Sequence, residues 1–224
     1  MRIKKLNLPW HEIDTVLLDM DGTLLDLHFD YHFWMDYLPK KYAEKNNISI
    51  DKADKFIHDK IHSQMGTLNW YCLDYWTEQL NLPVAKLKHD LKHLIKPHPE
   101  VLNFLQALRA SKKQVIMVTN AHRDSLDIKL EVTEIANYFD HIVSAHDYGK
   151  PKEDILIWQN IQQDHPFKAE TTLLIDDNIT ALTTAKAFGI KHCLAATFVS
   201  EKMDKIDPKD FQHFENFTQI MPKQ

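Results

Sequence analysis

The sequence predicts an α/β protein in which helices flank a parallel sheet and an all-helical segment is inserted after the first strand. From residue 100 onward, short apolar and β-branched runs alternate with stretches of helical periodicity. Such alternation is typical of parallel strands connected by helices. Between the first apolar run and residue 96, the spacing of the apolar residues is helical. We therefore expect one strand, then a helical unit, then the rest of the sheet.

Length, composition and charge narrow the kinds of partner that we expect. The chain has 224 residues, 44% of them hydrophobic and 26% charged, which is enough for one buried core and a small inserted domain. Its formal net charge of -5 provides no basic surface for nucleic acid. We see no apolar segment typical of a signal peptide or a membrane span. We expect a cytoplasmic protein with a small-molecule substrate and neither nucleic acid nor membrane as partner; protein partners stay unknown.

The first strand is expected over residues 15–18, a short apolar run that leads into two acids. Successive side chains of a strand point to opposite faces, so Asp19 and Asp21 should share one direction at its carboxyl end while Met20 turns away. Two neighbouring carboxylates repel each other unless a cation or a shared proton relieves them. The pattern therefore predicts a divalent metal, and Gly22 permits a sharp turn directly after it.

The helical unit is expected over about residues 29–95, where four apolar stripes repeat at helical spacing. The stripes include Phe33 and Tyr37, Ile57 and Ile61, Leu73 and Trp76, and Val84 and Leu91. A four-helix bundle of this size can bury its own core, and the two prolines of residues 96–99 break the helical pattern. We predict a helical cap domain over residues 26–96 and a core domain over residues 1–25 and 97–224.

The rest of the chain reads as alternating helices and strands. Strands are expected over residues 114–118, 142–145, 171–175 and 190–195. Helices are expected over residues 101–108, 126–132, 153–163 and 181–188, with a final helix over 208–221. The result is a Rossmann-like parallel sheet, in which ligands bind at the carboxyl ends of the strands.

Polar residues follow three of these strands in the order of a known family. Four groups of residues resemble the four motifs of the haloacid-dehalogenase-like (HAD) phosphohydrolases. They are the string Asp-x-Asp-Gly-Thr at residues 19–23, Thr119 and Asn120 after the second strand, a lysine before a helix, and the pair Asp176 and Asp177. The resemblance covers nearly the whole chain. It is closest to the bacterial 5′-nucleotidases that hydrolyse GMP and IMP, on residues 16–27, 29–30, 33–34, 68–76, 119–122 and 151–154.

The resemblance implies a nucleophile and an acid/base residue. Asp19 is expected to attack phosphorus, and Asp21 to protonate the leaving oxygen and then to activate water. Thr119 and the backbone amide of Asn120 are expected to hold phosphate oxygens. Dehalogenases of the family lack the acid at the position of Asp21, so its presence favours phosphoryl chemistry.

The resemblance also implies a magnesium site and a lysine. Mg²⁺ is expected to be held by Asp19, the backbone carbonyl of Asp21 and Asp176, with Asp177 orienting the site. The family's usual Lys-Pro pattern selects Lys150 as the phosphate lysine, whereas the spacing to Trp158 favours Lys152. We assign the role to Lys152, which leaves Lys150 as the alternative.

Substrate specificity is expected to reside in the helical segment. Residues 67–76 hold four aromatics, and only Trp76 fits the buried stripe that Leu73 begins, which leaves Trp70, Tyr71 and Tyr75 partly unaccounted for. Either all four pack in the bundle core, or some form a platform on which a flat base stacks. The candidate substrate contacts are Asn69, Trp70, Tyr71, Asp74, Tyr75 and, from the core, His122.

We therefore expect a Mg²⁺-dependent purine 5′-nucleotidase that hydrolyses GMP and IMP through an aspartyl-phosphate intermediate. The alternatives are a HAD phosphatase for a sugar phosphate or phosphoglycolate, a phosphoglucomutase-like enzyme, and a HAD-fold binding protein without catalysis.

Overall fold

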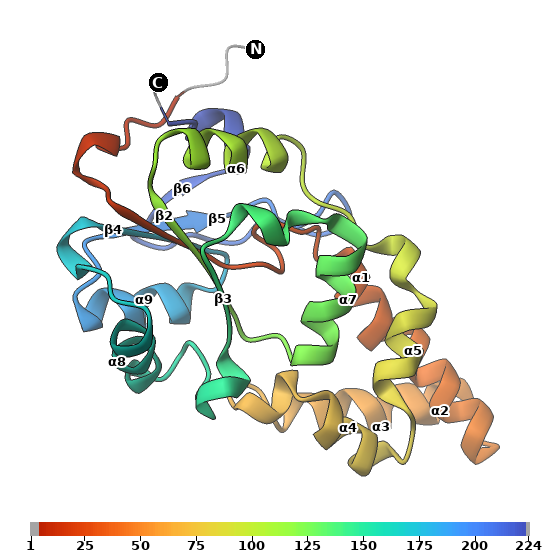
Figure 1. Cartoon of the computed structure of the whole chain (residues 1–224). Coiled ribbons are helices and arrows are strands. Elements are labelled where there is room, and N and C mark those ends of the chain that lie inside the picture. Colours follow the sequence, from red (N-terminus) through yellow and green to blue (C-terminus); the bar gives the residue numbers. More distant parts are fainter. Residues whose placement is uncertain (1–4, 223–224) are drawn as a thin grey trace.

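The computed structural model describes residues 5–222 and is organised around one six-stranded sheet (Figure 1). Its order is β3-β2-β1-β4-β5-β6, and every pair of neighbours is parallel. The first strand, β1, lies between β2 and β4, so three polar strand ends meet at the same edge. The strands are β1 (Thr15–Leu18), β2 (Gln114–Thr119), β3 (His141–Ser144), β4 (Thr172–Asp176), β5 (His192–Ala196) and β6 (Gln212–Phe214).

Helices cover both faces of the sheet, as the alternating pattern predicted (Figure 1). Val16 and Leu18 of β1 point into a core formed with α6 (Val101–Ala110) and α7 (Arg123–Thr133). Leu17 points the other way, toward α8 (Ile155–Asp164) and α9 (Ile179–Phe188). All three side chains are fully buried. The expected parallel sheet with helices on both faces is therefore confirmed.

Residues 26–96, the helical insert, contain helices and turns and no strand between β1 and β2. Its longer helices are α1 (His28–His32), η2 (Phe33–Tyr37, a π-helix), α2 (Leu38–Asn46), α3 (Ile50–His62), α4 (Leu73–Leu80) and α5 (Val84–Asp90). Short helical turns are η3 (Leu68–Tyr71) and η4 (Lys92–Leu94) in the insert, and η1 (Trp10–Glu12), η5 (Ile135–Tyr138), η6 (Ala145–Tyr148), η7 (Ala169–Thr171) and η8 (Phe217–Gln219) elsewhere. Within the described range, no helix is both long and apolar enough to cross a bilayer.

The two connections between the insert and the sheet run side by side. The amide of Asp26 donates to the carbonyl of Lys96 at 3.0 Å, and that of His98 donates to the carbonyl of Leu24 at 2.9 Å. The ammonium group of Lys96 also lies 3.2 Å from the carboxylate of Asp26. This paired ribbon places the insert next to the carboxyl end of β1.

The prediction of a helix over residues 208–221 is wrong. Residues 212–214 form β6 instead, which pairs with the edge of β5, and residues 217–219 form the single turn η8. Phe214 and Phe217 are buried, and the ring of Phe217 lies 4.8 Å from that of Phe104. Pairing with the free backbone groups of β5 and burial of these two rings overcame the local helical spacing.

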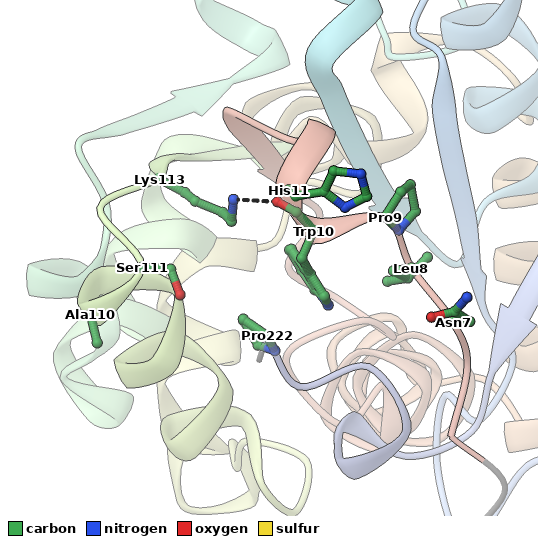
Figure 2. Close-up of a pocket in the computed structure, with 9 residues that line it drawn as sticks. All are labelled: Asn7, Leu8, Pro9, Trp10, His11, Ala110, Ser111, Lys113 and Pro222. Carbon is green, nitrogen blue, oxygen red and sulfur yellow. Dashed lines mark hydrogen bonds between the residues drawn. The ribbon is translucent and has the colours of Figure 1, made fainter. Parts of the chain in front are cut away.

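A cavity of about 810 Å³ lies at the opposite edge of the sheet, before β1 and β2 begin (Figure 2). Its lining includes Trp10 and Lys113, and the ammonium group of Lys113 donates to the carbonyls of Trp10 and Ile13 at 2.8 and 2.5 Å. None of the described residues that line it is acidic. Because the ammonium group of Lys113 is already bonded to these backbone carbonyls, the described residues of this cavity form no arrangement suited to catalysis.

Candidate active site

The polar residues that follow β1, β2 and β4 line one cavity of about 210 Å³, which we call the carboxylate cavity. Because β1 lies between β2 and β4, their ends converge although they are far apart in the sequence. The cavity is lined by Asp19, Asp21, Leu27, Trp70, Tyr71, Thr119, Asn120, Ala121, Lys152, Asp177 and Asn178. Most of the catalytic, phosphate-binding and metal-binding residues expected from the sequence are thus brought together.

Lys152 lies at the centre of this site. Its ammonium group is 2.6 Å from Oδ1 of Asp19 and 2.6 Å from Oδ2 of Asp176, and all three side chains are buried. Although burial opposes its charge, the carboxylates of Asp176 and Asp19 raise the pKa of Lys152 well above its usual value. Lys150 is only half-buried and pairs with Asp154 at 3.2 Å. The geometry therefore favours Lys152 over Lys150 as the lysine of the site.

The loop that carries Lys152 is held in place by its own backbone. The amide of Lys152 donates to Oδ1 of Asn120 at 2.9 Å, and its carbonyl accepts from Nε1 of Trp158 at 3.1 Å. The spacing to Trp158, which favoured Lys152 in the sequence, thus corresponds to a direct hydrogen bond.

Three acids face this single lysine. One carboxylate oxygen from each of Asp19, Asp176 and Asp177 lies within 4.8 Å of the other two. Burial raises the pKa of Asp176 to about 7, and burial beside Asp19 raises that of Asp177 well above its ordinary value. Oδ2 of Asp19 is buried and has no hydrogen-bond partner within residues 5–222. An unsatisfied oxygen and an excess of carboxylates fit a divalent cation with oxygen ligands.

Asp177 approaches the turn after β1 so closely that residue 22 must be glycine. Gly22 has a φ of +83°, and a Cβ atom there would lie 2.5 Å from Oδ2 of Asp177. From the sequence we expect Asp177 to orient the metal site, and its position also makes it a candidate metal ligand. The backbone carbonyl of Asp21 stays a predicted ligand.

Asp21 belongs to a second group of charges, which we call the Lys88–Lys129 network. Lys129 lies 2.6 Å from Oδ1 of Asp21 and 2.7 Å from Oδ2 of Asp30, and Lys88 binds the other oxygen of Asp30. Burial raises the pKa of Asp21 to about 6. Burial alone would also raise that of Asp30, but the charges of Lys129 and Lys88 lower it to about 2. Asp21 is thus the member of the network suited to carry a proton.

The sequence analysis did not identify Lys88 and Lys129. Both are buried on helix faces that are otherwise apolar: Lys88 follows Val84 by one helical turn, and Lys129 follows Leu126. The sequence feature that could have identified both residues is a lysine within an otherwise apolar helical stripe. Because β1 ends at Leu18, Asp21 lies in a turn, and its carboxylate binds a different lysine from that of Asp19.

Glu153 is the other residue that the sequence analysis missed. It accepts hydrogen bonds from Asn120 at 2.9 Å, from Asn178 at 2.7 Å and from the hydroxyl of Tyr71 at 3.2 Å. Burial raises the pKa of Tyr71, so its hydroxyl stays protonated and can donate. Glu153 therefore joins the helical insert to the loops after β2 and β4. Thr119 is buried nearby, and its hydroxyl accepts the amide of Ala121 at 3.0 Å.

A second cavity of about 210 Å³, the aromatic cavity, adjoins the first. Both are lined by Asp21, Leu27, Trp70, Tyr71 and Ala121, so they meet at Asp21. The aromatic cavity is further lined by Asp30, Tyr31, Trp34, Met35, Leu73, Lys88, His122, Ser125 and Lys129.

The six candidate substrate contacts divide into two groups. Trp70, Tyr71 and His122 line the aromatic cavity. Asn69, Asp74 and Tyr75 are not among the described residues that line either cavity. The side chain of Asn69 donates to Gln64 at 3.2 Å, the ring of Tyr75 packs edge-on against Trp76, and exposed Asp74 lies 3.5 Å from Nε2 of His122.

Comparison with known proteins gives close and distant relatives. The chain is 43% identical over 192 residues to the GMP/IMP nucleotidase YrfG of Escherichia coli (strain K12), a match that covers 86% of each protein. It is 24% identical over 197 residues to haloacetate dehalogenase H-2 of Moraxella sp. (strain B), covering 81% of this chain and 85% of that protein.

Solved structures share the fold at lower identity. The HAD phosphatase from Thermococcus onnurineus superposes with a TM-score of 0.76 at 19% identity, covering 90% of this chain and 93% of that one. CbbY from Rhodobacter sphaeroides, in complex with phosphate, gives a TM-score of 0.66 at 13% identity, covering 92% and 95%.

The family assignment rests on the sequence match together with this fold. The sequence pattern of the family described as haloacid dehalogenase-like hydrolase matches residues 16–195, which include all four motifs. The resemblance drawn from the motifs is therefore confirmed, and the chain belongs to the haloacid dehalogenase-like hydrolase family.

Proposed function

We propose that this hydrolase is a Mg²⁺-dependent 5′-nucleotidase that acts on purine nucleoside monophosphates in the cytoplasm. The observation that carries the proposal is the pair of adjoining cavities, one lined by carboxylates and Lys152 and the other walled by aromatic rings. A phosphate group fits the first and a nucleoside the second. The 43% identity to the GMP/IMP nucleotidase YrfG supports the choice of purines.

In this proposal Asp19 attacks the phosphorus atom. Oδ1 of Asp19 is held by Lys152 at 2.6 Å and Oδ2 has no hydrogen-bond partner among the described residues, so one oxygen of the carboxylate can face the metal while the other attacks. The new bond joins this oxygen to phosphorus while the ester bond to the nucleoside breaks, giving an aspartyl phosphate. Lys152 and Thr119, with the backbone amide of Asn120, hold the phosphoryl oxygens.

Asp21 moves the proton. Because burial raises its pKa to about 6, Asp21 can carry a proton near neutral pH and give it to the departing alkoxide. It then removes a proton from the water that hydrolyses the aspartyl phosphate. Lys129 fixes the Asp21 carboxyl group at the border of the two cavities.

The cluster of acids would hold the metal. Asp19, Asp176 and the backbone carbonyl of Asp21, with Asp177 beside them, are the groups that would bind Mg²⁺, which stabilises the negative charge of the transferring phosphoryl group when bound. The excess of carboxylates over lysine in this cluster supports the assignment.

The helical insert acts as a cap domain that supplies the nucleoside site. Trp70 and Tyr71 line both cavities, so a base can stack on them while its phosphate reaches Asp19. Stacking of a base on an aromatic ring contributes about 1–3 kcal/mol. Asn69, Asp74 and Tyr75 have no role in this proposal.

The experiment is a phosphate-release panel with IMP, GMP, AMP, CMP and small sugar phosphates, with Mg²⁺ and with chelator. We expect IMP and GMP to turn over fastest, and chelator to abolish the reaction. Equal or faster turnover of AMP, CMP or a sugar phosphate would contradict the purine assignment. Conversion of a sugar 1-phosphate without free phosphate would indicate a mutase, and no turnover of any monoester would indicate a binding protein.

A further inference from the structure

We propose that Cys72, His122 and His146 form a second metal site, specific for zinc, where the helical insert meets the core. One donor atom from each side chain lies within 4.8 Å of the other two. Cys72 precedes α4 in the insert, whereas His122 precedes α7 and His146 lies in η6 of the core. The cluster is separate from the acids of the carboxylate cavity.

His146 presents a nitrogen that has no other use. Its Nε2 is buried and finds no hydrogen-bond partner in the part of the chain that the structure describes. The imidazole is hydrogen-bonded to the backbone of Asn120, and because Nε2 is unpartnered this bond engages Nδ1. A histidine that ligates a metal commonly donates its other ring nitrogen to a backbone carbonyl, which fixes the tautomer. His146 thus has the arrangement of a ligand that lacks only the ion.

Cys72 and His122 are held against His146 by their own elements. Sγ of Cys72 accepts the amide of Tyr75 at 3.4 Å, which fixes the sulfur at the start of α4. The rings of His122 and His146 meet edge-on, with centroids 5.0 Å apart. Asp74, whose Oδ2 lies 3.5 Å from Nε2 of His122, is placed to supply a fourth ligand.

The ligand types select the metal. One thiolate and two imidazoles are the ligands of tetrahedral zinc sites, whereas Mg²⁺ requires oxygen ligands. Zinc bonds of about 2.0–2.3 Å place ligand atoms about 3.5 Å apart, so groups that lie within 4.8 Å of one another need to close by at most about 1.3 Å. The half-buried side chains of the cluster can make this movement by rotation.

A zinc ion at this site would fasten the insert to the core beside the substrate. His122 also lines the aromatic cavity, and Cys72 directly follows Tyr71. The ion would therefore restrain the segment that has to release the product. This consequence rests on the proposed function, and we expect zinc to slow turnover in the presence of excess Mg²⁺.

Cobalt tests the site without relying on activity. Co²⁺ added to the Mg²⁺-saturated full-length protein should give the charge-transfer absorption of a cobalt thiolate, and Zn²⁺ should displace it. The variants Cys72→Ser and His146→Asn should lose this band. Cys193→Ser and His58→Asn, changes of a half-buried cysteine in β5 and an exposed histidine of α3, should keep it. Absence of the band in the wild-type protein, or its persistence in Cys72→Ser, would overturn the proposal.

Inhibition tests the consequence. With excess Mg²⁺, Zn²⁺ should slow phosphate release by the wild-type protein. It should not affect Cys72→Ser, whose basal turnover we expect to match that of the wild type. Equal inhibition of both would place the inhibitory ion in the carboxylate cavity and contradict the regulatory role. If no nucleotide is hydrolysed, the proposed function fails, whereas the cobalt band still decides the metal site.

Discussion

Two buried groups of lysines and aspartates lie on either side of the reacting position, and they differ in charge balance. Around Lys152, the three carboxyl groups of Asp19, Asp176 and Asp177 outnumber the single ammonium group by two. In the Lys88–Lys129 network, two lysines face Asp21 and Asp30.

The difference indicates which group needs a cation. The Lys88–Lys129 network is balanced, and each of its carboxylates binds a lysine. The group around Lys152 contains an unpartnered oxygen on Asp19 and two carboxyls with raised pKa values. Burial of unpaired charge is costly, so an ion belongs in the first group and a proton shuttle in the second.

The largest expected effect concerns the nucleophile. Asp19→Asn should lower turnover by about 10⁴-fold, because the amide cannot form the acyl phosphate. Phosphate release from the best substrate of the panel measures this loss. Asp51→Asn, a change at an exposed acid in the first turn of α3, should keep full turnover. Undiminished activity of Asp19→Asn would assign the nucleophile elsewhere.

The difference in charge balance between the two groups is tested by measuring the free energy of unfolding in the presence of a chelator. Asp30→Asn leaves two buried lysines with one carboxylate, and we expect the free energy of unfolding to fall by about 3–5 kcal/mol. Asp19→Asn removes part of the negative excess and should leave this free energy unchanged or raise it. Urea unfolding of both variants decides the point. A similar loss of stability in the two variants would mean that the groups do not differ as described.

The pH dependence of stability is expected to depend on the metal. Because burial raises the pKa of Asp21 to about 6 and that of Asp176 to about 7, the folded protein holds protons that the unfolded chain has already lost. In chelator, stability should therefore fall as the pH rises from about 4 to about 7. Asp30, with a pKa of about 2, stabilises equally across this range.

Thermal unfolding across this pH range, with chelator and with Mg²⁺, measures the effect. Saturating Mg²⁺ should remove the decline, since the ion replaces the protons. A decline of equal size in both conditions would contradict the assignment of the cation to these acids.

The smallest expected effect concerns the contact between insert and core. Tyr71→Phe removes the hydrogen bond to Glu153 but keeps the ring, and we expect KM to rise about fivefold, as for a loss of about 1 kcal/mol. Tyr71→Ala, which also removes the stacking surface, should raise KM further. Steady-state kinetics of the two variants separate the hydroxyl from the ring. Equal KM values would show that the ring contributes nothing to binding.

Residues of the site could be predicted where a short local pattern in the sequence indicates their chemistry. Asp19 directly follows a buried apolar strand, Thr119 and Asp176 end two others, and Lys152 precedes a helix that contains Trp158. Asn178, which directly follows the pair of acids, caps α9, because its side chain accepts the amides of Thr180 and Ala181.

Other residues were not predictable because their partners lie in distant elements. Lys88 and Lys129 acquire their roles only when α5 and α7 pack around Asp30. Glu153 resembles an ordinary acid before a helix until Tyr71 reaches it from the insert. The strand β6 forms on the edge of β5, an interaction that no local pattern encodes.

The paired ribbon at Asp26 and Lys96 has a consequence for how such an enzyme can diversify. Since the insert leaves and rejoins the sheet at one point, its residues can be replaced or extended without altering the strand order or the acids beneath it. New specificities can then arise when the insert is exchanged at the ribbon while the catalytic residues of the sheet stay the same.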